Sequence, residues 1–168
     1  MRNTSLKKIY REGIDGYHFY GMVLDESSDF LLIAKEYDFQ IDGYSILRKS
    51  DITYSVSNKS TKYCFKILKA EKLLQSIQPQ HIDLTNWQTI FKSLGKGKFI
   101  TVEDEIEGDF SIGPIVRINK KSIVLDYFDG TGKWRGEEKS EYSNITSVDF
   151  DTNYINMHEK YITPNVIE

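Results

Sequence analysis

The chain has 168 residues, of which 39% are hydrophobic and 28% charged, a balance that excludes extended disorder. A net charge of −3 gives no general attraction to phosphate backbones, and a single cysteine, Cys64, excludes an internal disulfide. No run approaches the ~20 apolar residues that a membrane-spanning helix needs, and the N-terminus lacks the apolar segment of a signal peptide. We therefore expect a cytoplasmic protein without a membrane partner.

The first part of the chain predicts a series of short strands. A candidate strand at residues 14–20 precedes an apolar block that runs from Gly21 to residue 33 and is interrupted by an acidic turn at 25–29. Another apolar run follows at 44–47, and the block closes with the tripeptide Asp-Ile-Thr at 51–53. Several short strands joined by tight turns are typical of a small, strongly bent antiparallel barrel.

Residues 59–98 predict a helical connection. Apolar residues recur at intervals of three and four, a serine or threonine at 60–61 can cap the first helix, and Pro79 ends it. A second helix start is indicated by Thr85 with Gln88 three residues later, which is a capping-box pattern.

The last part of the chain repeats the order of the first. Gly113 opens an apolar run, a polar turn at 119–121 interrupts it, and a glycine-rich loop precedes the closing Asn-Ile-Thr at 144–146. The opening glycine and the closing isoleucine are 31 positions apart in the first block and 32 in the second. This spacing indicates an internal repeat.

We therefore expect a mainly β protein of the α+β class, with two small bent antiparallel β-barrels and a helical segment between them. The expected boundaries are residues 1–58 for the first barrel, 59–98 for the helical connecting segment, 99–151 for the second barrel, and 152–168 for a C-terminal helix and tail.

The block that begins at Gly21 resembles the first sequence motif of Sm and Sm-like proteins. These are five-stranded bent barrels, similar to SH3-like barrels, that often assemble into rings and bind RNA. In that family an Asp follows the glycine, and four residues later an Asn contacts a base; Asp25 and Asp29 have this spacing here. The second block places Asn119 and Ile123 at the same positions.

The resemblance covers the strand pattern but not the residues that read RNA. A carboxylate at Asp29 repels phosphate and lacks the donor of an amide, so RNA binding at the family site is disfavoured. The family's second motif has Arg-Gly before the last strand, where this chain has Arg48-Lys49. The overall pattern is also similar to uncharacterised bacterial proteins, a resemblance that implies no activity.

Metal binding and catalysis lack a sequence signature. His18, His81 and His158 lie on separate segments without a cysteine partner, whereas zinc needs about four converging ligands. The acidic loops do not match an EF-hand. We therefore expect no metal, no cofactor and no enzymatic activity, with a hydrolase site assembled only in space as an open alternative.

The leading hypothesis is a non-enzymatic binding or regulatory module that contacts another protein, and the alternative is an Sm-like protein that binds RNA or DNA. Acidic loops at 25–42 and 103–109 are either solvated turns or a surface for a basic partner. The lysines at 59–72 form either a solvated helix face or a stripe facing phosphates. The candidate partner-binding residues are Lys133, Trp134, Arg135, Arg48, Lys49, Asp25 and Asp29.

Overall fold

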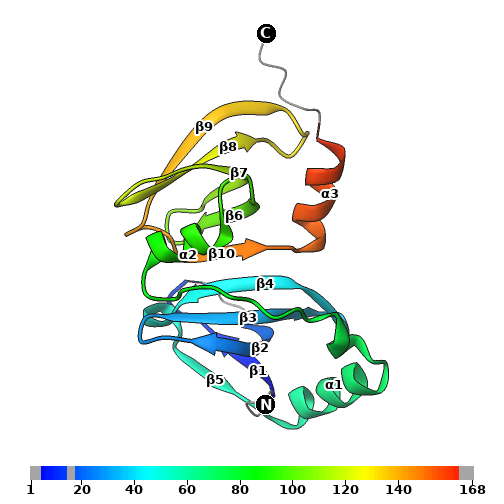
Figure 1. Ribbon diagram of the computed structural model, residues 1–168. Coiled ribbons are helices and arrows are strands. Elements are labelled where there is room, and N and C mark those ends of the chain that lie inside the picture. The colour runs from blue at the N-terminus through cyan, green and yellow to red at the C-terminus, as the bar shows by residue number, and fades with distance from the viewer. Residues whose placement is uncertain (1–4, 15–17, 163–168) are drawn as a thin grey trace.

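A computed structural model describes residues 5–14 and 18–162 of the chain. In this part of the chain, ten strands form one antiparallel sheet that does not close on itself, with three α-helices packed around it (Figure 1). No helix in the described ranges is both long and apolar enough to cross a membrane.

The strands of the first half lie side by side in the order β5-β1-β2-β3-β4. Their bounds, with a single 3-10 turn before the last strand, are β1 Leu6–Tyr10, β2 His18–Glu26, β3 Phe30–Tyr37, β4 Gln40–Arg48, η1 Lys49–Asp51 and β5 Tyr54–Val56.

The strands of the second half have the corresponding order, β10-β6-β7-β8-β9. Their bounds are β6 Phe99–Asp104, β7 Asp109–Ile118, β8 Ser122–Phe128, β9 Trp134–Glu141 and β10 Ser147–Phe150. The helices are α1 Lys59–Ala70, the short 3-10 helix η2 Leu73–Ser76, α2 Trp87–Leu94 and α3 Asn153–Tyr161.

The two halves are joined by β10, which pairs with β4 on one side and β6 on the other. Val148 of β10 lies opposite Ile46 of β4 and Val102 of β6, and all three side chains are buried. Strand β10 therefore fuses both halves into one sheet, which Figure 1 shows as two stacked lobes.

The expected mainly β, α+β architecture is confirmed. In chain order, α1, η2 and α2 follow β5 and precede β6. The expected pair of barrels is not confirmed, because the strands belong to one open sheet. The strand predicted at residues 14–20 is described only from His18, where β2 begins; residues 15–17 lie outside the described part of the chain.

Glycines allow close approach of neighbouring strands at the same place in each half. A Cβ on Gly21 would lie 2.7 Å from Cδ1 of Ile33, and one on Gly113 would lie 2.0 Å from the carbonyl oxygen of Asp126. A Cβ at Gly113 would overlap the backbone, and one at Gly21 would force Ile33 to shift, so glycine lets the second strand of each half lie close to the third.

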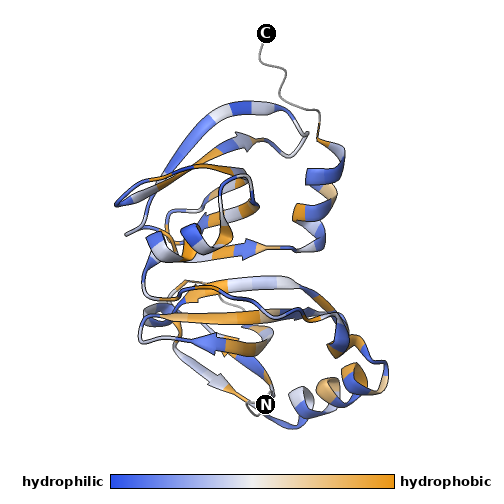
Figure 2. Cartoon of the chain, viewed as in Figure 1, coloured by the Kyte–Doolittle hydropathy of each residue, from blue (hydrophilic) through white to orange (hydrophobic). Residues whose placement is uncertain are grey.

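Side chains alternate between the two faces of the sheet, as the strand period of two requires. One face carries the main core, where strand residues such as Ile46 and Val148 pack with Leu68 of α1 and Phe91 of α2. The other face carries two smaller apolar clusters, one around Ile33 in the first half and one beneath α3 in the second. Apolar residues accordingly follow the central strands in Figure 2, whereas the outer strand β9 is largely hydrophilic.

Helices α1 and α2 each begin at an asparagine that the sequence patterns did not select. Asn58 caps α1 and Asn86 caps α2, and in each case the threonine three residues later completes a reciprocal capping box. The caps predicted at residues 60–61 and at Thr85 are therefore wrong. Asparagine is among the strongest N-cap residues, since its side-chain oxygen reaches the free backbone N–H groups of the first turn.

Candidate functional site

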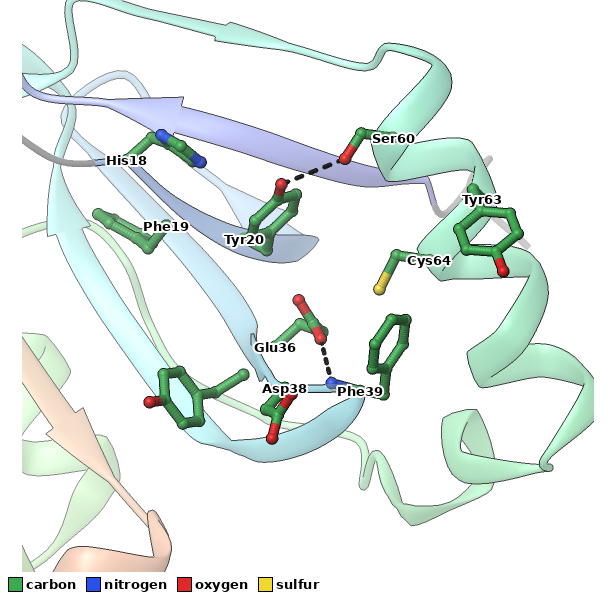
Figure 3. Close-up of a pocket in the computed structure, with 10 residues that line it drawn as sticks. His18, Phe19, Tyr20, Glu36, Asp38, Phe39, Ser60, Tyr63 and Cys64 are labelled. Atoms are coloured by element: carbon green, nitrogen blue, oxygen red, sulfur yellow. Dashed lines mark hydrogen bonds between the residues drawn. The ribbon is translucent and has the colours of Figure 1, made fainter.

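A cavity of about 620 Å³ opens between β2, the β3–β4 turn and helix α1 (Figure 3). We call it the aromatic groove because five of its lining residues carry aromatic rings: Phe19, Tyr20, Tyr37, Phe39 and Tyr63. The other lining residues are His18, Glu36, Asp38, Ser60 and Cys64.

The rim of the groove is built by a two-residue turn between β3 and β4. Tyr37 pairs with Gln40, so Asp38 and Phe39 alone form the loop, with φ angles of 48° and 60°. Tight hairpin turns of this kind favour Asn or Gly, because a bulky residue is strained at positive φ. The chain therefore holds an aromatic side chain, 43% exposed, at a conformationally costly position.

The floor of the groove contains a buried carboxylate. Glu36 is 8% exposed, and its Oε1 accepts a hydrogen bond from the backbone N–H of Phe39 at 2.7 Å. In Figure 3 the carboxylate points into the space between Tyr20, Cys64 and Phe39. Within residues 5–14 and 18–162, no ion pair joins Glu36 to a cationic side chain.

Cys64 contributes a protonated thiol to this floor. Burial raises the pKa of Cys64 to about 11, and the neighbouring Glu36 carboxylate raises it further by repulsion and by accepting the S–H. A thiol with such a pKa stays protonated near neutral pH and is a poor nucleophile there. Cys64 also belongs to the main core, where it packs as a small apolar side chain.

The far wall of the groove is formed by β2 and the first turn of α1. The hydroxyl of Tyr20 lies 3.3 Å from Oγ of Ser60, which links the strand to the helix. His18 packs edge-on against Tyr20 with ring centroids 5.4 Å apart. Tyr63 stands on the next turn of the helix and is 65% exposed, so its ring is available to a ligand.

The candidate residues selected from the sequence lie elsewhere. Arg48 pairs with Asp51 and donates to the carbonyl of Ser143, and Lys49 pairs with Glu26. The backbone N–H of Lys49 also donates to the carbonyl of Asp29. The structure thus gathers Arg48, Lys49 and Asp29 at the corner after β4. Asp25 lies next to Glu26, the ion-pair partner of Lys49.

The glycine-rich loop of the second half folds back onto its own strands. Arg135 pairs with Asp129, and Trp134 packs edge-on against Phe128 with ring centroids 5.6 Å apart. Lys133 stays exposed. None of the seven candidate residues lines the aromatic groove.

Sequence reasoning missed Glu36, Phe39 and Tyr63 as site residues. In the sequence, Glu36 is one of several acidic residues within 25–42, and Tyr63 is one apolar position of the helix pattern that begins near residue 60. The available signal was the dipeptide Asp38-Phe39 between two strands, where an unstrained two-residue turn would place Asn-Gly or Asp-Gly.

No three His, Cys, Asp or Glu side chains converge to hold a metal ion in the described ranges. No protein family matches the chain, and neither a curated protein nor a solved structure shows significant similarity to it.

Proposed function

We propose that this protein is a non-enzymatic binding module whose aromatic groove receives a lysine or arginine side chain of a protein partner. The observation that carries the proposal is the carboxylate of Glu36, which is buried at the floor of an open groove without a cationic partner among the described residues. Removing a charge from water is costly unless an opposite charge compensates it. A cationic side chain in the groove supplies that charge.

The walls of the groove suit the same ligand. The exposed rings of Tyr37, Phe39 and Tyr63 present faces to which a cation is attracted, with about 0.5–2 kcal/mol for each favourable contact. Asp38 adds a second carboxylate at the rim. The cavity of about 620 Å³ is large enough for a long side chain and the backbone that carries it.

The proposal extends to the origin of the fold: we infer that the two halves are copies of one Sm-like or SH3-like unit. The identical strand order in the two halves supports this inference, as do the paired glycines of the second strands and the shared Asx-Ile-Thr ending. The aromatic groove belongs to the first copy alone, since it depends on the β3–β4 turn and on α1.

RNA or DNA binding is the alternative, and the lysine face of α1 favours it. Five exposed lysines lie on this helix and its end: Lys59, Lys62, Lys66, Lys69 and Lys72. Binding through these residues would weaken steeply as salt is raised, because neutralised phosphates release counterions. A gel shift at low salt that disappears on replacement of Lys62 and Lys66 by Gln would support this alternative.

Selection of peptides from a random display library tests the leading proposal. We expect the wild-type chain to enrich peptides with a fixed Lys or Arg, and Glu36→Gln to lose at least tenfold in affinity for them. Glu107→Gln is the matched control, because Glu107 is exposed and remote from the groove. Enriched peptides without a basic residue, or equal binding by Glu36→Gln, would refute the proposal.

A further inference from the structure

A second cavity, of about 280 Å³, lies where the two halves of the sheet meet. It opens on the sheet face opposite the main core, between the small apolar clusters of the two halves. We call it the junction groove; its lining includes Arg11, Lys35, Glu103, Glu105, Ser147 and Asp149. The pairing of β10 with β4 and β6 creates this groove, so neither half has it alone.

Two cations in the junction groove are already paired. Arg11, 4% exposed, donates from Nη1 and Nη2 to the two carboxylate oxygens of Glu105, each at 2.6 Å. Glu105 also accepts a hydrogen bond of 2.7 Å from the hydroxyl of Thr146. Lys35 pairs with Asp149 at 2.5 Å. Both positive charges are therefore neutralised by carboxylates of the other half.

Glu103 is the third carboxylate of the junction groove. It lies opposite Ser147 in the β10–β6 pairing, and no hydrogen bond or ion pair of its side chain occurs within the described ranges. Among the described residues, three carboxylates thus face two cations in this groove, and His18 is the other titratable side chain that lines it.

We propose that the junction groove binds one cationic group, an ammonium or a guanidinium, whose charge is received by Glu103. The group completes the charge balance of the cavity, and Ser45 and Ser147 supply further acceptors for its N–H donors. The volume fits a group the size of one side chain. The site is separate from the aromatic groove, although His18 and Phe19 border both cavities.

Electrostatics at Glu103 make this binding dependent on pH. Burial, followed by repulsion from Glu105 and Asp149, raises the pKa of Glu103 to about 7, against the attraction of Lys35 and Arg11. A cation binds the ionised carboxylate, so affinity rises with pH through this range. The ionised fraction grows roughly tenfold between pH 6 and pH 8, and we expect the affinity to follow it.

NMR titration of the full chain with n-butylammonium and n-butylguanidinium chloride tests the proposal, with sodium chloride at equal concentration as the ionic-strength control. We expect saturable shifts of amide signals in β6 and β10 that tighten about tenfold from pH 6 to pH 8. Glu103→Gln removes the shifts, whereas Glu36→Gln and Glu107→Gln retain them. If the His18→Gln variant keeps the pH dependence of binding, the titrating group is Glu103 and not His18.

A parallel titration uses short peptides with one Lys or Arg and their citrulline or norleucine counterparts. Shifts caused by the free amines support a small-molecule site, and shifts caused only by the basic peptides support a site for a protein side chain. The proposal is overturned if neither probe gives saturable shifts, or if Glu103→Gln, confirmed as folded by its melting transition, responds like the wild type. The Glu36→Gln variant is titrated alongside. A loss of binding at the aromatic groove is therefore distinguished from a loss of binding at the junction groove.

Discussion

The carboxylate of Glu36 and the backbone N–H of Phe39 are joined by a hydrogen bond of 2.7 Å across the β3–β4 turn. This bond fixes the turn in which Phe39 adopts a φ of 60°, and it holds the same carboxylate at the floor of the aromatic groove. The strained residue and the buried charge are therefore parts of one arrangement. Such strain persists only where the surrounding structure enforces it, and it is often found at binding sites.

Replacing Phe39 by glycine is expected to have opposite effects on the stability of the protein and on its binding of basic peptides. Glycine tolerates positive φ, so we expect Phe39→Gly to raise the free energy of unfolding by roughly 0.5–1 kcal/mol, measured by urea denaturation. The same variant lacks the aromatic ring at the rim of the groove and binds basic peptides more weakly. Tyr37→Ala is the control, since it removes a neighbouring exposed ring without relieving the turn. Destabilisation by Phe39→Gly would show that the turn is not strained.

Glu103→Gln has an effect on stability that depends on pH. Because the pKa of Glu103 is raised to about 7 in the folded protein, the folded state retains a proton that the unfolded state has released between roughly pH 4.5 and 7. Stability therefore falls as pH rises through this range. We expect Glu103→Gln to stabilise the protein by roughly 1–3 kcal/mol at pH 8 and to have little effect at pH 4.

Melting curves at pH 4, 6 and 8 check this result. The control is Glu107→Gln, which replaces an exposed carboxylate. We expect this variant to show the same change in melting temperature with pH as the wild type. An equal stabilisation by Glu103→Gln at all three pH values would contradict the assignment of the pKa to Glu103.

The ion pair of Arg11 and Glu105 connects the two halves of the sheet. Burial opposes ionisation of Glu105, but hydrogen bonds from Arg11, Thr146 and Ser147 hold its pKa below the usual range. Arg11→Met leaves this carboxylate without its main partner and destabilises the protein by about 3–5 kcal/mol at neutral pH. The loss shrinks as the pH falls and Glu105 is protonated.

A double-mutant cycle measures the coupling. We expect Arg11→Met with Glu105→Gln to recover much of the loss, because the double variant no longer leaves the Glu105 carboxylate buried without Arg11. Additive losses in the double variant would show that the two residues act independently.

Gly43 marks the contact between β4 and the turn after β10. It has a φ of 67°, and a Cβ there would lie 2.5 Å from the backbone nitrogen of Thr152. We expect Gly43→Ala to lower the free energy of unfolding by roughly 2–4 kcal/mol, through both strain and overlap. Gly97→Ala is the matched control, since Gly97 also has a positive φ but an open surrounding, and it costs only about 1 kcal/mol. An equal decrease in the free energy of unfolding in the two variants would show that the close approach at Gly43 does not contribute to the cost of its replacement.

Much of the fold follows from the sequence, because strand alternation and tight turns are local signals. The blocks from Gly21 to Ile52 and from Gly113 to Ile145 fall in two sets of strands that have the same order in the sheet. The fusion of both sets into one sheet did not follow. It depends on the pairing of β10 with β4, about a hundred residues apart in the chain, and no local pattern specifies such a partner.

The candidate sites were less predictable than the fold. Glu36, Phe39 and Tyr63 meet only when α1 packs beside the β3–β4 turn, and Glu103 and Asp149 of the second half face Lys35 of the first half only across the junction. Charged and aromatic residues in loops were noticed in the sequence, but their burial was not. An exposed carboxylate in a loop is solvated by water, whereas a buried carboxylate is stabilised by a nearby cation.

Calorimetric titration of one selected basic peptide tests the central claim most directly. Two proteins, the wild-type chain and Glu36→Gln, are each titrated with two peptides. One peptide carries the basic residue, and the other carries norleucine in place of lysine or citrulline in place of arginine. We predict that each single change weakens binding at least tenfold and that the second change adds little to the first, because one ion pair is lost in either case. Independent, fully additive losses, or unchanged binding by Glu36→Gln, would contradict the assignment of Glu36 as the acceptor of a partner's cationic side chain.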